Sequence, residues 1–294
     1  MSNKLAMKVQ IAICPSSGFC FGVKRAVDIT EKMLSEHPGE KIFTLGPIVH
    51  NKKVVGNLES KGILSRESAD DMDSGIMIVR SHGVAPDIIE KAKKKGLSVT
   101  DATCPFVKKI HNIVKKLHVK GIPIIILGSE RHPEIQGIKG YAGAECFTAN
   151  SLSDIEKLPT LNKAGIVVQT TKIKEEFYTL AAELIKRIPE CHIYNTICRE
   201  TLRRQKNTAE LAFSSDIMII AGSKNSSNTS KLYSISSNLC SCAYWVENAS
   251  EVKQEWFKGK LSIGLACGAS TPIEELDEIK EKIKSYCSDI IIQA

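Results

Sequence analysis

The chain has 294 residues, 43% of them hydrophobic and 25% charged, a composition typical of a soluble globular protein with one large or two ordinary domains. No apolar run approaches the roughly 20 residues of a membrane-spanning helix, and the apolar stretch at 9–13 is too short for a secretory signal core, so we expect a cytoplasmic protein. The net charge of +7 fits an anionic partner, which could be nucleic acid, a phosphorylated metabolite or an acidic protein.

The cysteine content is high for such a chain, with ten cysteines in all. In a small secreted domain this number would indicate a disulfide framework, but the chain is neither small nor expected to be exported. In a reducing compartment, thiols are more often buried packing groups, metal ligands or redox groups.

The predicted elements repeat one design three times along the chain. In each repeat a β-prone run leads to a cysteine and a basic helix, and two further strands then end in polar clusters. The first repeat has a strand at 9–13, Cys20, a strand running from 42 into His50 and Asn51, a strand at 76–79 before His82, and a helix at 86–95. The second has Cys104, a strand from 124 into His132 and Glu134, a strand at 165–168 before Thr170, and a helix at 174–188. The third has Cys198, a strand at 217–221 before 222–228, a strand at 261–266 before Ser270, and a helix at 272–286.

Alternating strands and helices predict α/β units with parallel sheets, in which ligands collect at the carboxyl ends of the strands. Every polar cluster lies at such an end. We therefore expect three small α/β domains, 1–97, 98–190 and 191–294, in a pseudo-threefold arrangement around one buried site.

The three repeated cysteines could be buried packing groups, which is the usual role of a free thiol. Their matching position before a helix favours ligands instead, because a helix N-terminus stabilises a thiolate. Zinc is less suitable because structural zinc sites use short paired spacings such as C-x2-C, which are absent here. The close pair Cys240 and Cys242 is interpreted as structural and placed in a loop. Three thiolates suit an iron–sulfur cluster with one iron left open for a substrate.

The polar clusters contain groups suited to a phosphorylated ligand. His50, His82 and His132 each follow a strand, and imidazoles can bind diphosphate oxygens. The stretch 222–230 could be a flexible linker, but after a strand its hydroxyls and amides would cradle an anion. Glu134 is the acidic group of these clusters, and burial beside an anion would raise its pKa and suit it to proton donation.

These residues resemble the 4-hydroxy-3-methylbut-2-enyl diphosphate reductase family of the non-mevalonate isoprenoid pathway. The likeness covers essentially the whole chain and is carried, in order, by GFCFGVKRA, IVHN, SHGV, DATCP, HPE, QTT, TIC, GSKNSSN and GAS. Arg199-Glu200 and Ser129-Glu130-Arg131 differ from the family pattern, although neither difference removes a functional residue.

The resemblance implies a trefoil-like fold, a 4Fe–4S cluster on Cys20, Cys104 and Cys198, and a reduced ferredoxin or flavodoxin as electron donor. It implies a two-electron reductive dehydroxylation of the allylic diphosphate to isopentenyl and dimethylallyl diphosphates. It assigns proton donation to Glu134, with His132 and Thr170 as relays. The substrate-binding positions that it implies are His50, His82, His132, Thr170, Ser226, Ser227, Asn228 and Ser270.

Two other classes of function remain open at this point. A hydro-lyase of the dehydratase type could use the same kind of cluster without any electron input. A non-enzymatic iron–sulfur sensor could bind nucleic acid through the basic charge, although no helix-turn-helix or aromatic-rich binding strand is recognisable and aromatics make up only 5% of the chain. We expect neither nucleic acid nor a membrane as a partner.

Overall fold

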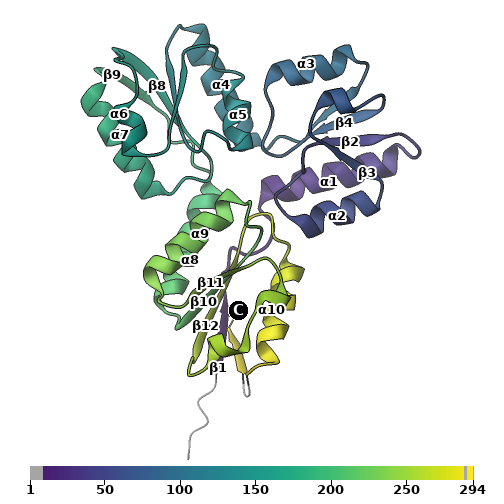
Figure 1. Ribbon diagram of the computed structural model, residues 1–294, viewed down its shortest axis with the longest axis vertical. Coiled ribbons are helices and arrows are strands. Elements are labelled where there is room, and N and C mark those ends of the chain that lie inside the picture. Colours follow the sequence, from purple (N-terminus) through teal and green to yellow (C-terminus); the bar gives the residue numbers. More distant parts are fainter. Residues whose placement is uncertain (1–8, 288–289, 294) are drawn as a thin grey trace, which may run out of the picture. The chain divides into compact units, whose positions relative to one another are not determined.

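The computed structural model describes residues 9–287 and 290–293 and divides the chain into two compact units. The one-sheet unit comprises residues up to Cys20, residues 50–52 and residues from Arg199 on; the two-sheet unit comprises 21–49 and 53–198. All the strand pairs are parallel. The predicted α/β class with three sheets is confirmed (Figure 1).

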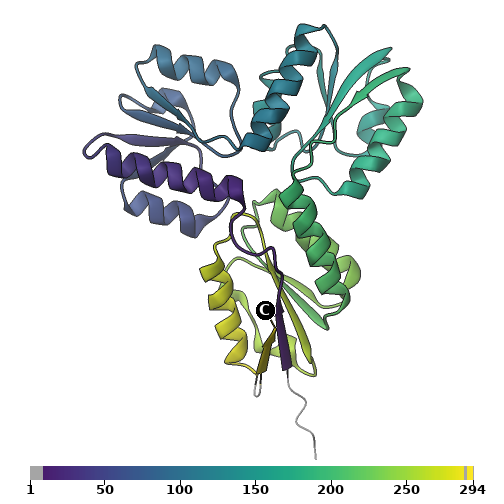
Figure 2. The ribbon, with the colours of Figure 1, turned by 180° about the vertical axis from the view of Figure 1, so that it is seen from behind.

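The one-sheet unit contains a sheet in the order β11-β10-β12-β1-β13. Helices α8 and α9 lie on one face of this sheet and α10 on the other (Figures 1 and 2). The strands are β1 (Val9–Ile13), β10 (Ile217–Ala221), β11 (Ala243–Val246), β12 (Ser262–Cys267) and β13 (Ile290–Gln293). The helices are α8 (Arg199–Phe213), α9 (Ser227–Leu239), α10 (Ile273–Lys284) and the short 3₁₀ turns η2 (Ala249–Glu251) and η3 (Gln254–Phe257).

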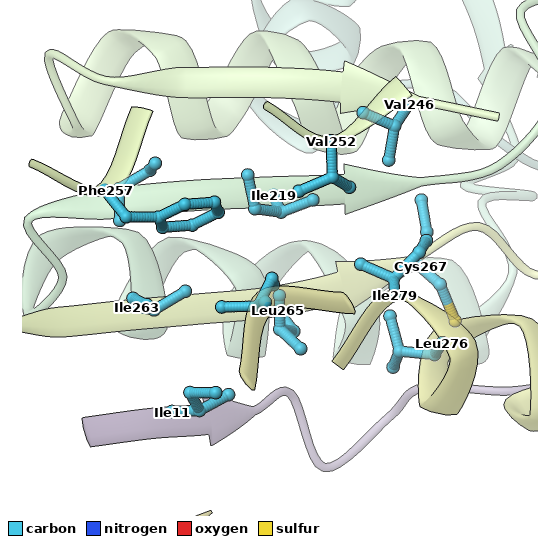
Figure 3. Close-up of a cluster of buried hydrophobic side chains, with 13 residues drawn as sticks. Ile11, Ile219, Val246, Val252, Phe257, Ile263, Leu265, Cys267, Leu276 and Ile279 are labelled. Carbon is cyan, nitrogen blue, oxygen red and sulfur yellow. The ribbon is translucent and has the colours of Figure 1, made fainter. Parts of the chain in front are cut away.

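The core of this unit follows from the period-2 alternation of the strands. Ile219 of β10, with Ile11 of β1 and Leu265 of β12, packs against Leu276 and Ile279 of α10 (Figure 3). The alternate β10 residues Met218 and Ile220 face the other way, in a cluster with Ala212 of α8 and Leu232 of α9. Because β10 is covered on both faces, its five residues are all buried.

The two-sheet unit contains the sheets β3-β2-β4-β5 and β7-β6-β8-β9. The elements of the first are α1 (Phe21–Glu36), β2 (Ile42–Leu45), α2 (Lys52–Ser60), β3 (Ile63–Arg66), η1 (Ala69–Asp71), β4 (Ile76–Val79), α3 (Pro86–Lys94) and β5 (Ser98–Asp101). Those of the second are α4 (Pro105–Val119), β6 (Ile124–Leu127), α5 (Pro133–Lys139), β7 (Cys146–Ala149), α6 (Leu152–Glu156), β8 (Lys163–Val168), α7 (Lys174–Arg187) and β9 (Glu190–Ile193).

The three sheets share one strand order, in which the strand before each cysteine lies beside the strand that ends in a polar cluster. The pairs are β5 with β4, β9 with β8, and β1 with β12. The repeat is therefore cyclic, because β1 at the start of the chain has the same place in the last sheet as β5 and β9 have in theirs.

Sheet membership differs from a sequential division at 97 and 190. Residues 9–13, expected with the first domain, pair with β12 and β13. Residues 98–101 complete the first sheet and 190–193 complete the second. Local sequence pattern predicts a strand but not its partner, because the partner is set by long-range hydrogen bonding. The pseudo-threefold arrangement around a central site stays a prediction.

The pair Cys240 and Cys242 lies in the loop between α9 and β11, as expected. The residues just before it, 236–238, belong to the last turn of α9, and Ser236 is fully buried there. Its tertiary packing outweighs the weak helix propensity of serine and asparagine. None of the helices in the described ranges is long and apolar enough to cross a membrane.

Candidate active site

Each repeated cysteine is held by the same backbone contact. Its peptide N–H donates to the carbonyl two residues beyond the end of the neighbouring strand, namely Cys20 to Ala269 (3.1 Å), Cys104 to Ser81 (3.0 Å) and Cys198 to Thr170 (3.0 Å). All three cysteines are half-buried and none is in a disulfide, and α1, α4 and α8 begin at the next residue. Pro105 occupies the first turn of α4, where its missing N–H costs no helical bond.

A glycine leaves space for one of these thiols. A Cβ atom at Gly22, in the first turn of α1, would lie 2.5 Å from Sγ of Cys104, well inside contact distance. Any side chain at this position would displace the thiol. Among the other cysteines, burial raises the pKa of Cys267 and Cys191, and raises that of Cys146 to about 11.

The carboxyl group of Glu134 is buried against Thr170. Oε1 of Glu134 accepts a hydrogen bond from the peptide N–H of Thr170 (2.7 Å), and Oε2 accepts one from the Thr170 hydroxyl (2.6 Å). Glu134 is only 2% exposed, and this burial raises its pKa although both hydrogen bonds act to lower it. A buried carboxyl with a raised pKa keeps its proton to higher pH than an exposed one, which suits it to proton donation.

His132 sits at the start of the same short helix. It is the N-cap residue of α5, and its Nδ1 accepts a hydrogen bond from the peptide N–H of Glu134 (3.1 Å). This contact places the proton of a neutral His132 on Nε2. The His82 ring packs edge-to-face against the His132 ring, with centroids 5.7 Å apart. The two-sheet unit thus brings together the predicted residues His82, His132, Glu134 and Thr170.

The loop that carries His82 has a defined conformation. Gly83 has φ of +74°, and a Cβ there would lie 2.7 Å from Cε1 of His111. His111 is buried, stacks on Tyr141 with centroids 4.3 Å apart, and has its pKa lowered to about 4 by burial. It therefore packs as a neutral ring beneath the loop, as expected for a histidine left out of the site.

In the one-sheet unit, the predicted anion cradle surrounds the first turn of α9. Ser226 is the N-cap, and its hydroxyl accepts a hydrogen bond from the peptide N–H of Thr229 (3.2 Å). Asn228 is 6% exposed, and its Nδ2 has no hydrogen-bond partner among the described residues. Buried amide donors are rarely left unpaired, and a helix N-terminus attracts anions, so the turn is suited to an anionic ligand. Ser227 lies half-buried in the same turn.

The remaining two predicted residues meet in the same unit. The Ser270 hydroxyl donates to the backbone carbonyl of His50 (2.9 Å). Next to it, Nδ2 of Asn51 lies 3.2 Å from each carboxylate oxygen of Glu275, and both residues are buried. These contacts hold residues 50 and 51 against the N-terminal end of α10.

Two positioning residues were not found from the sequence. Arg204 was counted only as part of a basic helix, but it is 2% exposed and its Nη2 donates to the carbonyl of Gly18 (2.7 Å), two residues before Cys20. The sequence feature that could have indicated this role is the helical spacing of the polar residues at 201, 204, 205 and 208, which are all buried in α8. Gln169 accepts a hydrogen bond from the peptide N–H of Ser129 (3.1 Å) and so ties the QTT segment to the turn before His132.

The chain matches the family described as LytB protein over residues 11–284. The chain belongs to this family.

Two relatives support the assignment over nearly the full length. The chain is 39% identical to the 4-hydroxy-3-methylbut-2-enyl diphosphate reductase of Aquifex aeolicus (strain VF5), covering 97% of this chain and 100% of that one. It is 40% identical to the enzyme of the same name from Pelobacter propionicus (strain DSM 2379 / NBRC 103807 / OttBd1), covering 94% and 98%.

Two solved structures are similar. One, of the E-1-hydroxy-2-methyl-but-2-enyl-4-diphosphate reductase from Plasmodium falciparum, has a TM-score of 0.91 and 30% identity over 97% of this chain and 91% of that chain. The other, of (E)-4-hydroxy-3-methyl-but-2-enyl diphosphate reductase, the terminal enzyme of the non-mevalonate pathway, has a TM-score of 0.68 and 39% identity over 94% and 99%. The resemblance carried by the motifs is confirmed, and this LytB chain is an enzyme of the oxidoreductase class.

Proposed function

We propose that this LytB protein reduces 4-hydroxy-3-methylbut-2-enyl diphosphate to isopentenyl and dimethylallyl diphosphates, the last step of the non-mevalonate pathway, in the cytoplasm. The observation that carries the proposal is 39% identity to a curated reductase over 97% of the chain. The reaction consumes two electrons and two protons. The allylic C–O bond breaks, a C–H bond forms, and the oxygen leaves as water.

The cofactor proposed is a 4Fe–4S cluster on Cys20, Cys104 and Cys198. Among the described residues no group of three His, Cys, Asp or Glu side chains forms a ready metal site. The donors nevertheless suit the cluster, because each is a cysteine outside any disulfide whose backbone is held by a hydrogen bond, and Gly22 leaves space at one of them. A bound cluster would supply the electrons and a Lewis-acidic iron for the hydroxyl group.

Glu134 is proposed as the proton donor. Its raised pKa keeps the acid form available, and the Thr170 hydroxyl against its Oε2 offers a path for the proton. His132 orients this acid, since its Nδ1 accepts a hydrogen bond from the peptide N–H of Glu134. The proton would be released to the substrate oxygen as the C–O bond breaks.

The diphosphate is proposed to bind Ser226, Ser227, Asn228 and Ser270, together with His50, His82 and His132. The unpaired Nδ2 of Asn228 at the N-terminus of α9 supports this role most directly. Holding the phosphates by several groups fixes the reacting end of a small substrate, which lowers the entropic part of the barrier.

The test is anaerobic turnover of the hydroxylated C5 diphosphate by protein with confirmed iron and sulfide content, with and without reductant. We expect both C5 products only when a reduced ferredoxin, a reduced flavodoxin or a chemical reductant is present. Conversion without any reductant would favour the dehydratase alternative. No conversion at all by cluster-intact protein would refute the proposed reaction.

A further inference from the structure

The three helices that follow the cysteines differ sharply in charge. Helix α1 carries three cationic and three acidic side chains, and α8 carries four and two. Helix α4 carries four lysines and no acidic residue, and Lys120 follows at its end. No aspartate or glutamate occurs between Asp101 and Glu130.

Most lysines of α4 also have no acidic side chain paired with them among the described residues. Among the described residues, Lys108 is the α4 lysine with an ion pair, to Asp101, whereas Lys109, Lys115, Lys116 and Lys120 have none. On α1, Lys24 pairs with Asp28, and on α8, Arg203 pairs with Glu200. The field of α4 is therefore not cancelled locally as it is on the other two helices.

The unpaired lysines form part of one exposed surface. Lys109, Asn112 and Lys116 follow each other at helical spacing on the solvent side of α4. Asn112, Lys115, Lys116 and Lys120 surround a shallow hollow of about 450 Å³ together with Val119, whose side chain is 77% exposed. We call Lys109, Asn112, Lys115, Lys116, Val119 and Lys120 the α4 stripe.

One end of the α4 stripe lies near a proposed cluster ligand. Helix α4 begins at Pro105, the residue after Cys104. At about 1.5 Å per residue, Lys109 lies roughly 7 Å along the axis from Cys104, and the whole helix is roughly 22 Å long. This length suits the small interfaces that transient redox complexes form.

We propose that the α4 stripe is the docking surface for an acidic protein that carries one electron at a time. The proposal rests on the reductase function proposed above. Two successive encounters, each oxidising the carrier by one electron, would supply the two electrons that break the C–O bond. An apolar contact at Val119 with a cationic rim matches the anatomy of such interfaces, and complementary charge raises the association rate.

The test compares the variant K109E/K116E with K93E/K94E, which makes the same change of charge on exposed residues of α3. Turnover is measured with a reduced ferredoxin and, separately, with a dithionite-reduced viologen that needs no docking surface. For K109E/K116E we expect kcat/KM for ferredoxin to fall at least tenfold and its salt dependence to weaken, while viologen-driven turnover is unchanged. The control should stay within about twofold in both assays.

Two results would overturn the docking surface. One is ferredoxin turnover by K109E/K116E within twofold of the wild type, and the other is an equal loss in K93E/K94E. Salt-sensitive binding of DNA or anionic vesicles that only K109E/K116E loses, with ferredoxin turnover intact, would assign the stripe to those ligands instead. Failure of the wild type to turn over even with viologen refutes the reductase function itself, and the docking proposal with it.

Discussion

The two-sheet unit contains one buried acidic side chain, Glu134, whose pKa is raised. Both carboxyl oxygens of Glu134 accept hydrogen bonds from one residue, Thr170, and the groups that shift its pKa include no cation. Burial therefore dominates and raises its pKa. Structural ion pairs lower the pKa of a carboxylate, as Lys139 does for the nearby Glu130, so the opposite shift at Glu134 indicates a functional acid.

Replacing this acid tests its role in turnover. In Glu134→Gln, the amide oxygen can still accept from the Thr170 N–H and the amide nitrogen can donate to the Thr170 hydroxyl, so we expect normal folding and iron content. Turnover should fall by roughly 100-fold or more because the proton donor is lost. The control is Glu130→Gln, which removes an exposed acid four positions earlier. Activity of Glu134→Gln close to that of the wild type would rule out the assignment.

The same variant should change the pH dependence of stability. The pKa of Glu134 is raised in the folded state, so its protonation stabilises the fold fully below the unfolded pKa, and that stabilisation is lost as pH rises through the folded pKa. The glutamine in Glu134→Gln does not titrate, so the stability of the variant has no contribution of this kind to lose. Denaturation followed by far-UV circular dichroism should therefore show the variant gaining on the wild type as pH rises from 5 to 8. A constant difference across that range would contradict the raised pKa.

The space beside Cys104 gives a second test at a single residue. In Gly22→Ala the new Cβ would lie 2.5 Å from the Cys104 thiol, so we expect the protein to fold but to retain less than half of the wild-type iron after anaerobic reconstitution. Gly56→Ala on α2 is the matched control, since a Cβ there meets nothing within 4 Å. It should keep full iron and gain about 0.5–1 kcal/mol of stability. Full iron in Gly22→Ala would contradict a ligand role for Cys104.

At the scale of elements, the sequence predicted strands and local motifs far better than partnerships. The runs at 76–79 and 217–221 coincide with β4 and β10, because continuous apolar runs of this length are typical of buried strands. The contact of Glu134 with Thr170 arises because both residues follow neighbouring strands of one parallel sheet, and their proposed roles stay a prediction. The place of residues 9–13 was not predicted, because β pairing over 250 residues leaves no local trace.

The hydrogen bonds from Arg204 to the carbonyls of Gly18 and Cys267, which we call the Arg204 clamp, could not be predicted from local pattern either. Arg204 Nη2 holds the Gly18 carbonyl at 2.7 Å and Nη1 contacts the Cys267 carbonyl at 3.4 Å, while the Gly18 N–H donates to the Cys267 thiol at 3.0 Å. A charged residue in a basic helix is normally assigned to the solvent side. Here the inner face of α8 is polar, and its arginine fixes the loop that carries Cys20.

Removing this clamp should destabilise the one-sheet unit. In Arg204→Gln the buried Gly18 carbonyl loses a charged donor, and we expect a loss of about 1.5–3 kcal/mol. Arg203→Gln, its exposed neighbour with a surface ion pair, should change stability by less than about 0.5 kcal/mol. Both tryptophans of the chain, Trp245 and Trp256, lie in this unit, so tryptophan fluorescence during urea denaturation reports on it selectively. Equal midpoints for the two variants would show that Arg204 is not a clamp.

At the scale of the whole molecule, two of the places where the chain passes from one unit to the other follow proposed cluster ligands. Cys20 is the last residue of the one-sheet unit before α1, and Cys198 is the last of the two-sheet unit before α8. The cyclic strand order explains this. Each cysteine lies between a strand that belongs to one sheet and a helix that belongs to the next repeat. Strand β1 closes the cycle by lying between β12 and β13.

This closure predicts that a residue near the start of the chain controls unfolding of the last sheet. Ile11 of β1 is fully buried in the cluster that contains Leu265 and Leu276, so Ile11→Ala should cost about 2–5 kcal/mol. The loss should appear in the tryptophan-reported transition, although both tryptophans lie more than 230 positions away in the sequence. Gln10→Ala, the exposed neighbour on the same strand, should leave that transition within about 0.5 kcal/mol. If Ile11→Ala left the tryptophan transition at the wild-type midpoint, β1 would not be an integral strand of that sheet, and the cyclic repeat would fail with it.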